Sequence, residues 1–106
     1  MNAPELLGAI SAAAEGLSSA TGRTFLKLMR EFIGALAHVP DFPAAEFTTL
    51  EIEQLSATAE QVIEAIERRL ENSKDRVATQ QELAESVYEI RRELEEITRR
   101  RRHYLH

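Results

Sequence analysis

Three histidines and many carboxylates are the side chains with which this sequence could do chemistry. His103 and His106 are spaced i,i+3, as two metal ligands on one helix would be, but four arginines precede them near the C-terminus. Di-iron helical bundles need a Glu three residues before each histidine, and those positions hold Ala35, Arg100 and His103. We therefore predict no metal site.

The carboxylates and glycines give no sign of catalysis. Acidic residues recur on the solvent-facing side of a helical repeat, a spacing that does not gather two carboxylates in a pocket. The four glycines stand alone at positions 8, 16, 22 and 34, which excludes a glycine-rich phosphate loop, and there is no Cys. We expect a protein without a catalytic residue, a cofactor or enzymatic activity.

A run of four arginines near the C-terminus is the strongest candidate for ligand binding. Residues 91–106 carry six Arg and three Glu, whereas residues 48–90 carry ten acidic and four basic residues. Arg99, Arg100, Arg101 and Arg102 could contact the phosphates of a nucleic acid or an anionic membrane surface. The alternative, which we favour, is that their positive charges interact favourably with the negative, C-terminal end of a helix dipole.

Residues 79–87 (TQQELAESV) resemble the second helix of repressor-type helix-turn-helix domains, which often begins with a Thr-Gln-Glu-Glu-Leu-Ala run. The resemblance covers nine residues. Where that family turns at a Gly, this chain has Tyr88, Glu89 and Ile90 and continues its helical repeat. This departure leaves no family to assign.

Residues 48–104 contain no Pro and no Gly and carry a heptad repeat of apolar residues, which is typical of coiled coils and helical bundles. With Ile52 at position a, both ends of the repeat are apolar at a and d, and in the middle the apolar row moves to e. We predict that this heptad face is the interaction surface. It comprises Leu55, Val62, Ile63, Ile66, Leu70, Val77, Leu83, Val87, Ile90, Leu94 and Ile97.

The heptad face is too wide for one partner helix, because apolar or small residues also occupy e and g. We expect its centre to contact at least two neighbours. Ile63, Leu70 and Val77 should be buried against the N-terminal helices or a second chain.

The heptad-patterned segment is either one helix or an antiparallel hairpin broken near Asn72–Asp75. These four residues are poor helix formers and include good caps, which permits a turn. Against a turn, there is no Gly or Pro, and the heptad keeps one register through the segment. We lean to the continuous helix, which would be about 80 Å long and would require a partner.

The first 38 residues predict a helical hairpin or one bent helix. Asn2, Pro4 and Glu5 form a helix start, and residues 18–22 weaken the helix before a strongly apolar segment resumes at Phe25. His38 is placed to interact with the end of the helix dipole.

The linker, residues 39–47, should be ordered. Pro40 ends the preceding helix, and we expect Phe42 and Phe47 to pin the linker onto the bundle. Thr48 and Glu51 form a capping box that begins the next helix.

Size and composition fit one soluble domain with an aliphatic core, since the chain has 106 residues, of which 43% are hydrophobic and 6% aromatic. No run of 18 apolar residues exists and no basic segment precedes the first apolar stretch, so we expect a cytoplasmic protein.

The sequence thus predicts an all-α helical bundle or coiled coil: one domain, residues 1–106, with N-terminal helices at 4–38, a linker at 39–47 and a heptad-patterned element at 48–104. We expect a protein–protein interaction module, either a homo-oligomer of two or more chains or a small helical subunit of a larger assembly. The alternative function is a nucleic-acid-binding accessory protein that dimerises through its heptads.

Overall fold

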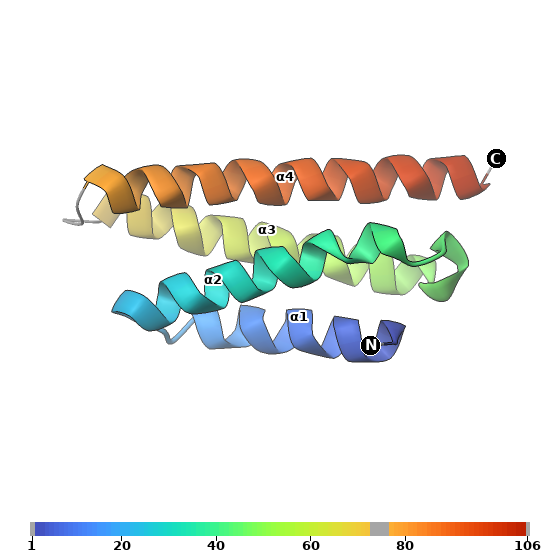
Figure 1. The fold of residues 1–106 in the computed structure, drawn as a ribbon, viewed down its shortest axis with the longest axis horizontal. Coiled ribbons are helices and arrows are strands. Elements are labelled where there is room, and N and C mark those ends of the chain that lie inside the picture. The colour runs from blue at the N-terminus through green and yellow to red at the C-terminus, as the bar shows by residue number, and fades with distance from the viewer. Residues whose placement is uncertain (1, 73–76, 106) are drawn as a thin grey trace.

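Two helical hairpins lie side by side in the computed structural model, which describes residues 2–72 and 77–105, with the backbone alone for residues 78 and 103–105 (Figure 1). The first hairpin consists of α1 (Ala3–Leu17) and α2 (Gly22–Ala37), and the second of α3 (Thr49–Asn72) and α4 (Val77–Leu105). The all-α bundle that the sequence predicts is confirmed. None of the described helices has an apolar stretch long enough to span a membrane.

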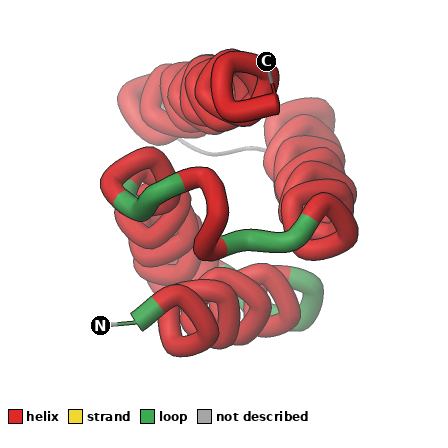
Figure 2. Tube along the Cα trace, turned by 90° about the vertical axis from the view of Figure 1, so that its right-hand side faces the viewer, coloured by secondary structure: helices red, strands yellow, loops and turns green. Residues whose placement is uncertain are grey.

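The helices follow one another around the bundle axis in the order α1, α2, α4, α3 (Figure 2). Helices α1 and α3 run in the same direction and pack together, as do α2 and α4. Helices α2 and α3 therefore occupy opposite corners. The segment that joins them crosses one end of the bundle from corner to corner.

Local sequence signals account for the start of the first hairpin and for the turn between its two helices. The Asn2 side chain accepts a hydrogen bond of 2.9 Å from the Glu5 backbone N–H, and the Glu5 carboxylate accepts one from the Asn2 backbone N–H, which confirms the expected helix start. Gly22 begins α2 with a φ of 55°, a conformation that a residue with a Cβ adopts only with strain. The helical hairpin, not the bent helix, is therefore formed.

The crossing linker contains two short 3₁₀ helices, Val39–Asp41 and Ala44–Glu46. Phe47 is 3% exposed, Phe42 is half-buried, and their ring centroids lie 5.7 Å apart, edge to face. Both rings thus attach the linker to the bundle, as expected. Thr48 and Glu51 then cap α3 reciprocally, with hydrogen bonds of 2.9 and 3.1 Å.

The heptad-patterned segment is an antiparallel hairpin, and our preference for one continuous helix was wrong. Helix α3 ends at Asn72, α4 begins at Val77, and the two helices run in opposite directions (Figure 1). Residues 73–76 between them lie outside the described residues. The helices separate where the sequence has poor helix formers and no Gly or Pro. Residues 79–87 lie inside the uninterrupted helix α4, with no turn like that of a helix-turn-helix domain.

One core runs through the bundle and includes Met29, Phe32, Leu36, Ala59 and Ile66, all fully buried. Among the α4 residues whose side chains the structure describes, the buried ones are at heptad positions d and g. They are Leu83, Ser86, Ile90 and Ile97.

The expected buried row of Ile63, Leu70 and Val77 is only partly correct. Ile63 is 1% exposed and Leu70 is half-buried, but Val77 is 78% exposed. The row does not continue because the chain reverses between Leu70 and Val77, and the reversal turns the same heptad position toward solvent.

Candidate interaction surfaces

The heptad face is mostly the core of this single chain. Seven of its residues are at most 5% exposed; they are Leu55, Val62, Ile63, Ile66, Leu83, Ile90 and Ile97. Leu70, Val87 and Leu94 are half-buried at the edges of the core, and Val77 is exposed. One chain therefore covers most of this face, because α1 and α2 pack against it together with the facing arm of the hairpin.

Arg101 binds the linker that crosses the end of the bundle. Its Nη1 atom donates hydrogen bonds to the carbonyl oxygens of Ala44 and Phe47, at 2.8 and 2.7 Å. Its Nη2 atom donates to the Thr49 hydroxyl at 2.8 Å. One planar guanidinium thus joins the last turns of α4 to both the linker and the first turn of α3.

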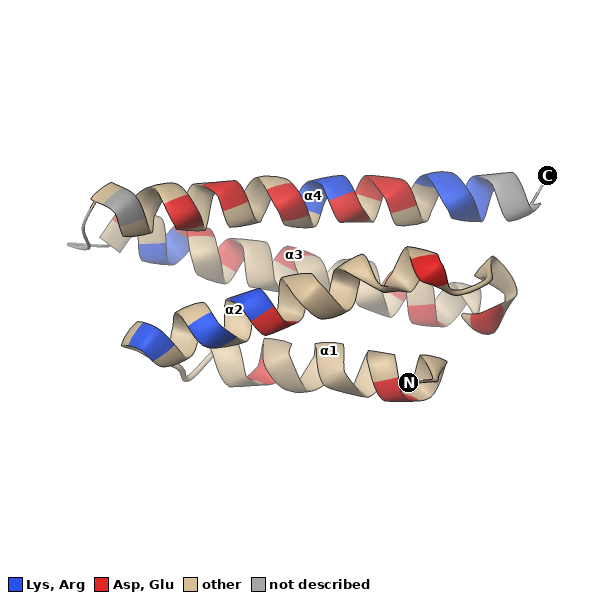
Figure 3. Cartoon of the chain, viewed as in Figure 1, with Lys and Arg blue, Asp and Glu red and all other residues tan. Residues whose placement is uncertain are grey.

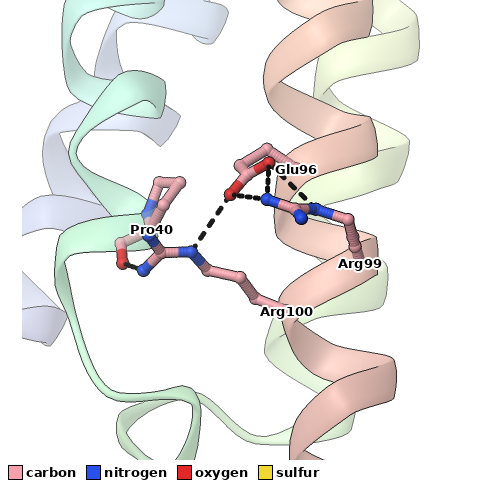
Figure 4. Close-up of polar contacts among 4 residues, drawn as sticks. All are labelled: Pro40, Glu96, Arg99 and Arg100. Carbon is pink, nitrogen blue, oxygen red and sulfur yellow. Dashed lines mark hydrogen bonds and ion pairs between the residues drawn. The ribbon is translucent and has the colours of Figure 1, made fainter.

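Arg100 makes the second contact of this kind, because its Nη1 atom donates to the carbonyl oxygen of Pro40 (Figure 4). Its Nε atom also lies 3.2 Å from the Glu96 carboxylate, which Arg99 approaches to 2.6 Å from the other side. The hydrogen bonds from Arg99 and Arg100 lower the pKa of Glu96. Arg102 is exposed at the rim of a groove between α3 and α4.

No pattern in the sequence predicts this role of Arg100 and Arg101. Their partners are mainly backbone carbonyls that become available only where the linker crosses the bundle. The Pro-rich linker and the arginine run were both evident, but no spacing in the sequence links them.

Helix α3 carries a row of glutamates on its solvent face. Glu53, Glu60, Glu64, Glu67 and Glu71 are all exposed, and their spacing returns to one side of the helix every three, four or seven residues. The buried residues of α3 lie on its other side. This acidic row therefore lies on the solvent side of α3.

Helix α2 carries the opposite charge. Arg23, Lys27 and Arg30 are exposed at i, i+4 and i+7 on the first half of the helix (Figure 3). They lie opposite the buried residues of α2, which include Phe25 and Met29. Since α2 and α3 occupy opposite corners of the bundle, this basic row and the acidic row lie on opposite sides of it.

A groove of about 710 Å³ opens where α1 ends beside α3. Leu17, Phe25 and Val62 contribute its apolar part, and the Arg69 guanidinium lies 4.6 Å from the centroid of the Phe25 ring. That distance is within the range of a cation–π interaction, which joins α3 to the start of α2.

No protein-family model matches the sequence, and neither the curated proteins nor the solved structures provide a match.

Proposed function

We propose that the protein is a non-enzymatic protein–protein interaction module that binds through charged rows on its outer faces. It would act as a homo-oligomer or as a small helical subunit of a larger assembly. The observation that carries this proposal is the segregation of charge: the acidic row on α3 and the basic row on α2 point away from a core that one chain completes.

The placement of the charged groups supports binding in preference to catalysis. The acidic and basic rows follow the solvent faces of helices, where complementary charge guides association and selects partners. Within the described residues, no group of three or more His, Asp or Glu side chains converges as metal ligands would.

A composition without Cys agrees with the cytoplasmic location that we propose.

Contacts of the arginine run favour a protein partner over the nucleic-acid alternative. Arg100 and Arg101 donate to carbonyl groups of the same chain, and Arg99 and Arg100 share the Glu96 carboxylate. Fewer of these positive charges are therefore available to bind phosphates. Non-specific affinity for nucleic acid depends on that neutralisation of phosphate charge.

The size of the protein in an extract of its own cells tests the proposal. Gel filtration of a freshly prepared extract, with detection by antibody, should place the protein well above its mass of 12.0 kDa. A variant in which the charges of the acidic row are reversed should elute at the position expected for a single chain. Elution of the parent as a free 12.0 kDa chain would contradict an interaction function.

A further inference from the structure

We propose that the two charged rows bind each other, so that α2 of one copy docks on α3 of a second copy displaced sideways in the same orientation. This inference rests on the proposed function and names the partner as a second copy of this chain. It follows from three properties of the rows: their sign, their spacing and their level along the bundle.

The spacings of the two rows match in an antiparallel arrangement. Along α2, the steps from Arg23 to Lys27 to Arg30 are four and three residues. Along α3 in the reverse direction, the steps from Glu71 to Glu67 to Glu64 are also four and three. Because both helices rise by about 1.5 Å per residue, the three charges of each row have the same separations along the axis.

A contact inside the chain fixes the levels of the rows. The Arg69 guanidinium lies over the Phe25 ring, so these residues are at about the same height on helices that run in opposite directions. Counting outward from this contact, Arg23 is level with Glu71, Lys27 with Glu67 and Arg30 with Glu64. A second copy needs only a sideways shift, without a shift along the axis, to pair them.

Existing contacts leave room for this pairing. Within the described part of the chain, Arg23, Lys27, Glu64 and Glu71 have no ion-pair partner. Arg30 and Glu67 each have one, Glu82 and Arg91 respectively, and all four of these side chains are at least one-third exposed. Exposed ion pairs of this kind contribute little to the stability of the fold, so Arg30 and Glu67 can also bind a second copy at low cost.

The symmetry of the contact predicts the kind of assembly that forms. The basic row of one copy meets the acidic row of the next, so the interface is heterologous and repeats through successive copies. An interface of exposed ion pairs should also be weak and should dissociate as salt screens the charges.

A pair of charge-reversal variants tests the proposal. Variant A is Arg23→Glu with Lys27→Glu, and variant B is Glu67→Lys with Glu71→Lys. Each reversal changes the net charge by two, which takes −5 to −9 in variant A and to −1 in variant B. Because both variants stay negative, net charge alone cannot draw them together.

Sedimentation equilibrium at about 20 mM salt, where screening extends over about 20 Å, should give a mass for the parent that rises with concentration above 12.0 kDa. Variants A and B should each stay at the mass of one chain. An equimolar mixture should regain the parent's association, because the reversed pairs 23–71 and 27–67 match again, and this recovery shows that both variants fold. High salt should abolish association in the parent and in the mixture.

A control variant separates the rows from the overall charge. Glu85→Lys with Glu89→Lys also gives a net charge of −1, but it changes exposed residues of α4 outside both rows. It should associate like the parent. Loss of association in this control, retention in A or B alone, or failure of the mixture would each overturn the proposal.

Zero-length cross-linking of amines to carboxylates tests the register directly. In a mixture of light and heavy-isotope protein, Lys27 should link to Glu67 between light and heavy copies, with Glu64 and Glu71 as the next sites. A mixed-isotope sample that links Lys27 only within one copy would overturn it. If the purified parent stays a monomer while the native complex in cell extract is large, this inference fails and the proposed function stands with another partner.

Discussion

Arg101 should be the most important of the four consecutive arginines for stability. Its guanidinium holds two linker carbonyls and the Thr49 hydroxyl, all at 2.7–2.8 Å. A hydrogen bond with a charged group contributes roughly 1.5–3 kcal/mol. Water can reach part of this half-buried site, so we take the low end for the two carbonyl bonds and expect Arg101→Ala to cost about 3 kcal/mol.

Urea unfolding and thermal melting followed by circular dichroism measure this loss. For a domain of this size, 3 kcal/mol corresponds to a fall in Tm of about 15 °C. Arg102→Ala is the matched control, because Arg102 is exposed on the same turn; its effect should stay within about 0.5 kcal/mol.

Arg101→Lys separates this geometry from charge alone. A lysine keeps the positive charge that opposes the helix dipole, but one ammonium group cannot match the planar fork that reaches two carbonyls and a hydroxyl. We expect more than half of the alanine effect. A lysine variant as stable as the parent would refute the role of the fork and restore the dipole explanation.

Three further predictions follow from burial, conformation and pKa. Ile63→Asp should destabilise the fold by several kcal/mol, whereas Val77→Asp should change it by no more than about 0.5 kcal/mol, since Ile63 is 1% and Val77 78% exposed; equal urea midpoints would contradict the hairpin. Gly8→Ala should stabilise α1 by about 0.4–1 kcal/mol, because a Cβ there meets open space, and a lowered Tm would disprove that. The hydrogen bond from the Thr48 backbone N–H, with a second from its side chain, lowers the pKa of Glu51 below its ordinary 4.5. Its ionised form therefore stabilises the fold above pH 4.5, and this contribution is lost as the pH falls below that value. Glu51→Gln should show a smaller loss of urea midpoint between neutral pH and acid, and an unchanged pH profile would contradict it.

Local signals in the sequence predicted the local structure well. The Asn2–Glu5 cap, the Thr48–Glu51 cap and the burial of Phe47 each depend on residues close together in the chain, so the sequence contains the information for them. The all-α fold followed from the helical periodicity for the same reason.

Long-range features were not predictable in the same way. The heptad register of α4 matches that of α3 across the break, which looked like evidence for one helix, but two arms can share a register without being continuous. The buried line on α4 then runs through d and g, including Ser86, because the first hairpin contributes part of the covering surface. The corner-to-corner path of the linker decides the partners of Arg100 and Arg101, and no local pattern encodes that path.

The distance between the start of α3 and the end of α4 within one chain tests most directly whether residues 48–104 complete the core as a hairpin. The chain has no Cys, so Glu53→Cys with Thr98→Cys allows specific spin labelling at two exposed positions. Pulsed electron resonance on labelled protein diluted with unlabelled protein reports the intrachain distance. In a bundle with extents of 47 × 22 × 18 Å, we expect a distance near its 22 Å width. A distance of roughly 65–70 Å, as one continuous helix would give at about 1.5 Å per residue, would contradict the account.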